Sequence, residues 1–268
     1  MTTYWFEVAR KDFADAVRSR LFWALSVLML ALAAGGMYVP RAIDDQPAAT
    51  DGLDLLSEAM LLLVPVIGLF VGYMAVVGER RTGSIRMVLS LPLKRSEVIL
   101  GKYLGRTAVV VVPIVLGFAL AAPLVVALYG SLPVADYAGF VTRVALTGAV
   151  FVAIAVGISG SVAARGTALG LVVGTYVLFE FFWGLVPLGV YVLLNGELVD
   201  PTAAPTWYDA VLRIQPSNAV DAAVGGLDGI STARPLVLQE WTAAILVVLW
   251  LAGPLAIGYR RFVRADIS

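Results

Sequence analysis

The sequence predicts an all-α polytopic membrane protein with six transmembrane helices in a single domain, residues 1–268. Three observations lead to this prediction: the composition, the number of long apolar runs and the uneven distribution of Lys and Arg. The chain is 60% hydrophobic and only 14% charged, with a mean hydropathy of +0.90, whereas soluble domains are about 25% charged. No charged block is long enough to form a separate soluble domain.

Runs of about 20 apolar residues can cross a hydrocarbon core of ~30 Å. The sequence contains six such runs, at 21–39, 58–77, 106–129, 139–163, 167–186 and 241–259. An even number places both termini on one side. The stretches on that side hold 15 of the 19 Lys and Arg residues, and the other side has only Arg41, Arg143, Arg213 and Arg234. Because basic residues favour the cytoplasm, we expect a multi-pass protein of the plasma membrane with both termini cytoplasmic.

The first 20 residues are predicted to form a helix at the membrane interface. At 100° per residue one face is apolar and the other charged. The apolar face holds Trp5, Phe6, Ala9, Phe13, Ala16 and Val17, and the charged face holds Glu7, Lys11, Asp15 and Arg18. A simple cytoplasmic extension of the first span is the alternative, which the aromatic residues disfavour.

Residues 78–105 form a basic cytoplasmic stretch between the second and third spans. Ile85, Val88 and Leu89 recur at helical spacing, Pro92 ends that short helix, and a second helix runs into the third span. The stretch therefore reads as a helical hairpin. Its seven basic residues could serve only to orient the chain, but that purpose requires neither the apolar stripe nor Pro92.

The fifth apolar run is too long for one upright crossing. Residues 167–194 number 28, which as a helix would extend about 42 Å. Pro187 is the predicted break, and residues 187–240 are predicted to form an amphipathic re-entrant segment at the outer face. A disordered loop is the alternative, which its aromatic residues disfavour.

Two features of the fifth span suggest specific contacts. Gly166, Gly170 and Gly174 form a smooth face for helix packing; we expect packing within the chain, although contact between two chains is left open. Glu180 is the one acidic residue deep inside a span, and such residues usually face a partner or a wet cavity. Arg143 of the fourth span is its candidate partner. With Tyr176 they form a candidate translocation path, and a structural or snorkelling role is the alternative.

Several kinds of catalysis are excluded by missing residue types, since the chain has no His and no Cys. Gly157–Ser161, GISGS, matches the Gly-x-Ser-Gly pattern of intramembrane serine proteases, but its hydroxyl lacks a histidine base. Helix packing is therefore the favoured interpretation. Zinc or haem ligation by histidine is excluded too. Gly101-Lys102 lacks the remainder of a phosphate loop, so we expect no enzyme activity and no cofactor or metal in this chain, and nothing indicates nucleic acid as a partner.

The stretch GERRTGSIRMVLSLPLKRSEVILGKYLGR resembles the loop after the second span of ABC type-2 transporter permeases. The matching positions are Glu79, Gly83, Ser90, Pro92, Arg95, Gly101 and Lys102. The six spans, the N-terminal helix and the outer segment fit the same family over essentially the whole chain. Within it, the chain is most similar to permeases of the nitrous-oxide-reductase maturation type (NosY-like), and the Ala, Val and Gly content suggests a prokaryotic source.

The resemblance implies a permease subunit of an ABC transporter, with export as the expected direction, in which a separate cytosolic ATPase drives translocation. It implies two such ATPase subunits, which bind ATP and Mg, and a second permease chain in a homodimer. Residues 78–105 would be the coupling loop, with a coupling helix that contacts the ATPase. The contact residues would be Glu79, Arg81, Gly83, Ile85, Arg86, Leu89, Leu91, Pro92 and Arg95. An ATPase-independent secondary transporter or channel, and a membrane scaffold or maturation factor, remain alternatives.

Overall fold

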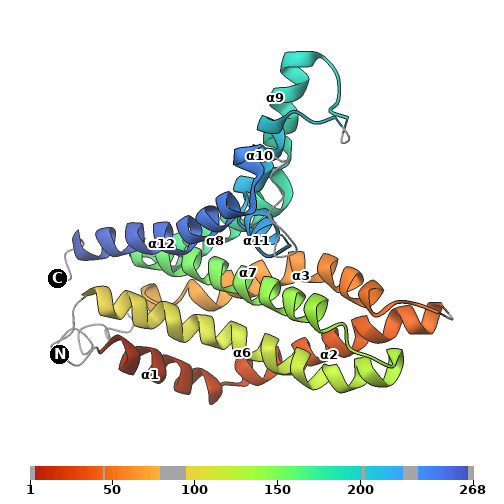
Figure 1. Ribbon diagram of the computed structural model, residues 1–268. Helices are drawn as coiled ribbons and strands as arrows, with labels where there is room; N and C mark the ends of the chain where they lie inside the picture. The colour runs from red at the N-terminus through yellow and green to blue at the C-terminus, as the bar shows by residue number, and fades with distance from the viewer. Residues whose placement is uncertain (1–3, 45, 79–94, 201–202, 226–234, 265–268) are drawn as a thin grey trace.

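The computed structural model describes residues 4–44, 46–78, 95–200, 203–225 and 235–264, and within them it is helical without strands (Figure 1). Six described helices are long and apolar enough to cross a membrane, which confirms the predicted fold class. The first and the last described residues of the chain lie at the same end of the bundle (Figure 1). The six helices are α2 (Arg20–Ile43), α3 (Ala49–Gly72), α6 (Arg95–Tyr129), α7 (Val134–Ser161), α8 (Arg165–Val177) with the π-helix Leu178–Phe182, and α12 (Glu240–Arg264).

Two predicted span ends are wrong. α3 ends at Gly72 and the chain turns at 73–76, although the apolar run continues to Val77. The break in the fifth run lies at 183–184, after the π-helix, and not at Pro187. Pro187 lies in the first turn of α9 (Leu185–Asn195), where a proline is tolerated because the N–H it lacks has no partner within the helix.

α7 is the central helix of the bundle. Residues 147–157 are buried on every side, and α7 packs against α3, α6, α8, α11 and α12. Its middle, TGAVFVAIAVG, is apolar or small all round, which is the pattern of a fully buried helix. Two clusters of buried side chains meet at this helix, one shared mainly with α2, α3 and α6 and the other with α3, α8, α11 and α12.

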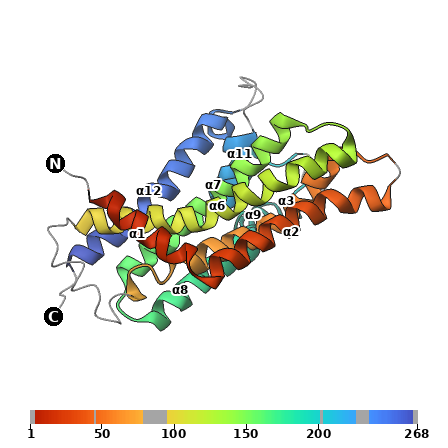
Figure 2. The same ribbon diagram turned by 90° about the horizontal axis from the view of Figure 1, so that it is seen from below.

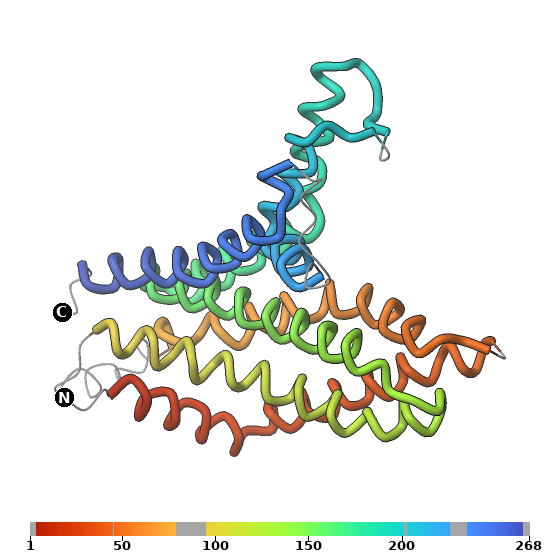
Figure 3. The backbone as a smooth tube through the Cα atoms, in the orientation of Figure 1, coloured from red at the N-terminus to blue at the C-terminus, as the bar shows by residue number. Residues whose placement is uncertain are grey.

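The segment between α8 and α12 leaves the bundle and then returns to it. α9 and α10 (Thr206–Ile214) project away from the long helices (Figures 1 and 3), and the Tyr191 and Tyr208 rings meet edge to face between them. α11 (Pro216–Val224) then packs on α7 and α12, and the 3-10 turn Leu236–Leu238 precedes α12. The indoles of Trp183 and Trp250 donate to carbonyls at the end of α10. They thereby join the segment to the bundle.

α1 (Trp5–Val17) packs lengthwise along the first part of α6, as Figures 1 and 2 both show. Part of the predicted apolar stripe is used here, because Phe13, Ala16 and Val17 pack against the core of the bundle. The most buried residue of α1, however, is the charged Asp12. The placement of α1 at a membrane surface remains a prediction.

The glycines of α8 do not pack within the chain, so our expectation for Gly166, Gly170 and Gly174 is wrong. A methyl group added at any of the three would meet nothing within 4 Å. The physical reason is that glycine spacing reports how smooth a helix face is but not which helix covers it. Other glycines do permit close intramolecular crossings, among them that of α7 and α12, where Gly157 and Gly258 are in contact.

Candidate functional site

Most of the predicted ATPase-contact residues lie in 79–94, outside the described residues. They are Glu79, Arg81, Gly83, Ile85, Arg86, Leu89, Leu91 and Pro92; Arg95 alone lies within the described part of the chain. The structure does describe the residues on either side of this segment, up to Gly78 before it and from Arg95 after it. We refer to residues 79–94, after the prediction, as the coupling segment, and to the contacts next to its two ends as the frame of the coupling segment.

Ser159 holds the backbone just before residues 79–94. The backbone amides of Val76 and Val77 both donate to its hydroxyl oxygen, each at 3.0 Å, and the serine is fully buried. Two amides that no longer have helical partners beyond α3 are thereby satisfied. Arg106 also donates to the Val71 carbonyl at 3.4 Å. The serine of the GISGS motif therefore has a structural role, as the packing interpretation predicted.

We expect Ser159→Ala to destabilise the protein by about 2 to 6 kcal/mol, because a buried donor left without an acceptor costs about 1–3 kcal/mol and two donors are affected. Thermal unfolding of the purified protein in detergent would measure this loss. Ser161→Ala is the matched control, since the Ser161 hydroxyl donates to a carbonyl of its own helix, that of Gly157. Equal unfolding temperatures for the two variants would contradict the role of Ser159.

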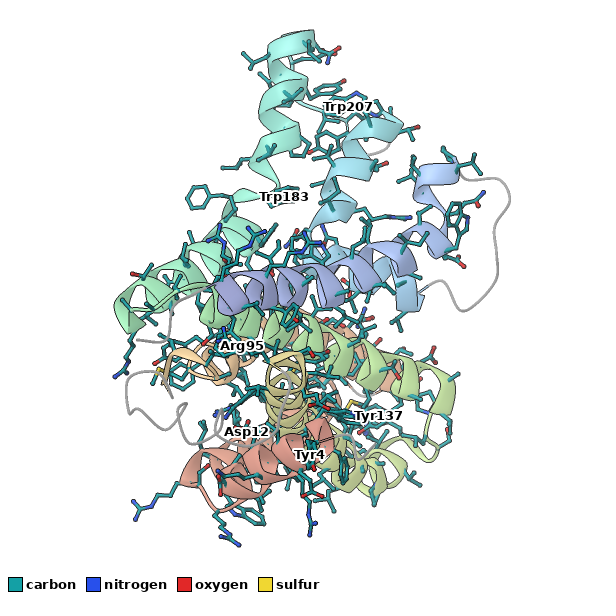
Figure 4. The ribbon with its side chains drawn as sticks, turned by 90° about the vertical axis from the view of Figure 1, so that its left-hand side faces the viewer. Tyr4, Asp12, Arg95, Tyr137, Trp183 and Trp207 are labelled. Atoms are coloured by element: carbon teal, nitrogen blue, oxygen red, sulfur yellow. The ribbon has the colours of Figure 1, made fainter. Side chains whose placement is uncertain are left out.

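Arg95, the first described residue after this segment, is bound to the end of α12. One of its guanidinium nitrogens, Nη1, donates to the carbonyls of Phe262 and Val263, at 3.1 and 2.9 Å, and the guanidinium lies 5.7 Å above the Phe262 ring. Both carbonyls belong to the last turn of α12, where the helix dipole favours a cation. In Figure 4, Arg95 lies between α6 and α12. The start of α6 and the end of α12 are therefore joined.

An ion triad joins the same part of α6 to α1; two of its members are buried, and the third, Arg106, is 27% exposed. Lys102 Nζ lies 3.0 Å from Asp12 Oδ1, and Arg106 Nε lies 2.8 Å from Asp12 Oδ2 as an ion pair rather than an aligned hydrogen bond. The Asp12 and Lys102 side chains are only 7% and 8% exposed. Figure 4 shows Asp12 on the side of α1 that faces α6.

Two residues of the pattern that resembles the family, Gly101 and Lys102, lie in the contact between α1 and α6, as does Gly105. A methyl group at Gly101 would come within 2.6 Å of Val8 Cβ, and one at Gly105 within 2.8 Å of Asp12 Cβ, so only glycine permits α1 to approach this closely. Lys102 supplies a cation of the triad. Asp12 was not singled out from the sequence, because its partner is 90 positions away.

A second polar cluster lies around α11. Glu180 accepts hydrogen bonds from Ser217 at 2.9 Å and from Gln215 at 3.4 Å, while Arg143 pairs with Asp221 at 3.6 Å. The predicted pairing of Glu180 with Arg143 is therefore wrong. The reason is that α11 returns between their helices and gives each residue its own partner, Ser217 and Asp221 being one turn apart.

The other groups of this cluster line two cavities. Arg143 donates to Ser57 Oγ at 2.7 Å, and both residues line cavities of about 130 and 510 Å³. Tyr176 donates instead to the Leu62 carbonyl at 3.2 Å. Burial raises the pKa of the Asp221 carboxyl and the Arg143 guanidinium opposes the rise; since this side chain is 47% exposed, solvent screening keeps the effect small. No three acidic side chains in the described part of the chain form a metal site.

Comparison with known proteins places this geometry in context. The family model of the ABC-2 family transporter proteins matches residues 6–267. The "Probable ABC transporter permease protein NosY" of Pseudomonas aeruginosa is 30% identical over 274 residues, covering 97% of this chain and 98% of the relative. The protein of the same name from Stutzerimonas stutzeri is 29% identical over 260 residues, covering 94% and 92%.

Proposed function

The chain belongs to the ABC-2 family of transporter proteins, and from this membership we propose that, as a membrane permease subunit, it couples ATP hydrolysis by a separate cytosolic ATPase to export across the plasma membrane. Both termini and residues 79–94 then lie in the cytoplasm. ATP and Mg bind to the ATPase subunit, because the sequence of this chain contains no phosphate loop.

The frame of the coupling segment is the observation that supports this proposal. The segment leaves from amides held by Ser159 of α7 and returns at Arg95, which is bound to the end of α12. Next to it, α1 is joined to α6 by the ion triad. A displacement of residues 79–94 by the ATPase would therefore reach α1, α6, α7 and α12 together, as a conformational step between inward- and outward-open states requires.

The double variant Arg86→Glu with Leu89→Ala should release the ATPase. It reverses a charge and removes an apolar anchor from the predicted coupling helix, and truncation of such anchors commonly costs about 2 kcal/mol or more of binding. The tagged chain would be purified from its native host with its ATPase, and the ATP hydrolysis of the purified complex would be measured. We expect at least about a tenfold loss of associated activity.

Arg41→Glu with Leu55→Ala makes the same chemical changes at exposed positions at the other end of the bundle, and it should retain the activity. If the double variant at 86 and 89 also retained full activity, the coupling assignment would be wrong. A wild-type chain that purified without any ATP-hydrolysing subunit would favour an ATPase-independent transporter or a scaffold.

We extend the proposal to a homodimer that forms across α8. Only 11% of the apolar window of this span is buried within the chain, against 61% for α7. Its three glycines present an open face on which a second helix could approach closely. Exposed apolar side chains at Leu169 and Val173 flank that face.

Disulfide cross-linking would test the dimer, and the absence of native cysteine makes it direct. Gly170→Cys should form a species of twice the mass under mild oxidation in the membrane. Leu120→Cys, on the exposed side of α6, should remain monomeric. Cross-linking of both variants to the same extent would indicate random collision rather than a defined interface.

The proposal also assigns Glu180, Arg143 and Tyr176 to the translocation path. Its support is that Glu180 and Arg143 each pair with a side chain of α11, and that two cavities lie at Arg143. Arg143→Gln should accordingly leave the associated ATPase bound but reduce its stimulation by substrate. Loss of the ATPase from this variant would argue for a structural role.

A further inference from the structure

A cavity of about 560 Å³ lies between α1 and α6, and it extends to the start of α2 and the end of α3. Ser19 and Leu21 line it at the beginning of one span, and Val71 lines it at the end of another. Spans begin and end where hydrocarbon gives way to headgroups and water. The cavity therefore lies at headgroup level, whichever leaflet this end of the bundle occupies.

The lining of the cavity is divided by chemistry. Apolar side chains of Leu21, Val71 and Val109 form the part that faces the spans. The ion triad of Asp12, Lys102 and Arg106 contributes two cations and one anion, and hence one net positive charge. The exposed rim on α1 consists of Glu7, Lys11 and Asp15, which carry one net negative charge.

A net positive triad beside apolar side chains, with a net negative rim, suits one kind of ligand. A phosphodiester suits the interior, because arginine and lysine are the usual donors to phosphate. A primary ammonium group suits the rim carboxylates, to which it can donate hydrogen bonds. Acyl chains suit the apolar side. A purely anionic headgroup would meet two carboxylates at the rim, and a quaternary ammonium would have no N–H to donate.

We propose that this cavity binds a zwitterionic phospholipid with a primary amine in its headgroup, of the phosphatidylethanolamine kind, taken from the surrounding leaflet. The lipid would contact α1, α2, α3 and α6 at once and would stabilise the packing of α1 on α6. The proposal does not depend on ATPase coupling, so either can fail without the other.

Native mass spectrometry of the delipidated full chain would test this. Dioleoyl phosphatidylethanolamine, phosphatidylcholine and phosphatidylglycerol would be added separately at equal concentrations. We expect the ethanolamine lipid to be retained about tenfold more strongly than the other two, since a hydrogen bond to a charged group is worth about 1.5–3 kcal/mol. The double variant Glu7→Gln with Asp15→Asn, at exposed positions, should lose this preference.

Asp54→Asn with Asp136→Asn is the matched control, because it removes two exposed carboxylates at the opposite end of the bundle, and it should keep the preference. Equal retention of the three lipids by the wild-type chain would overturn the proposal, as would an unchanged preference in the Glu7 and Asp15 variant. Soluble glycerophosphoethanolamine should bind much more weakly than the lipid. Binding of equal strength would show that the site takes a soluble phosphate compound and not a lipid.

Discussion

Gly157→Val is expected to separate α7 from α12 and to destabilise the protein by about 3 kcal/mol or more, the upper range for overpacking a core. Any side chain at Gly157 would fall on the backbone carbonyl of Pro254. On the other helix, a methyl group at Gly258 would come within 2.7 Å of the Gly157 carbonyl oxygen. A clash with backbone cannot be relieved by a change of rotamer, so the helices themselves would have to move.

Thermal unfolding in detergent, followed by size-exclusion chromatography after heating, would measure this effect. Gly253→Val is the matched control: it lies on α12, and a methyl group there would meet nothing within 4 Å. We expect the control to unfold within a few degrees of the wild type. Similar unfolding temperatures for the two variants would contradict the close crossing of α7 and α12.

Asp12→Ala is expected to cost about 3–5 kcal/mol, the usual penalty for breaking a buried ion pair from one side. The substitution removes the carboxylate that balances Lys102 and Arg106, and the Lys102 side chain is only 8% exposed. Because the triad joins α1 to α6, α1 should detach before the bundle unfolds. Limited proteolysis in the first 20 residues, together with thermal unfolding, would detect both effects.

A compensating variant tests whether the charges of the triad, rather than the packing of the Asp12 side chain, contribute the stability. Asp12→Leu with Lys102→Met and Arg106→Met replaces all three charges of the triad by apolar groups, and such replacements are often neutral, so this variant should recover much of the loss. Arg10→Ala, which removes an exposed charge from the same helix, should have little effect. An Asp12→Ala variant as stable as Arg10→Ala would mean that the triad contributes nothing to stability.

Hydropathy and charge were sufficient to predict the six spans. Each is a local property that adds up along the chain, and burial in hydrocarbon rewards a long apolar run whatever its partners are. The exact ends were less predictable. The run that includes Val77 is apolar enough to extend the second span, but the buried Ser159 hydroxyl takes the amides at 76 and 77, and the helix ends at Gly72.

The candidate site was predicted in part. The assignment of the charged, proline-containing stretch as a coupling segment stays a prediction, while Gly101 and Lys102 belonged to the pattern that resembled the family. Their reason, close packing on α1 and the pairing with Asp12, is visible only in the folded chain. Likewise, Glu180 and Arg143 were recognised as unusual, but their partners on α11 were not.

The sequence by itself determined the membrane class and the number of spans, because these follow from local hydropathy and charge. Only the tertiary structure decided which glycine face packs within the chain, which carboxylate pairs with Arg143 and what holds the two ends of the coupling segment. The physical reason is distance along the chain: Val76 and Ser159 are 83 positions apart, and Asp12 and Lys102 are 90 positions apart. Such contacts depend on how whole helices approach one another, which no local pattern encodes.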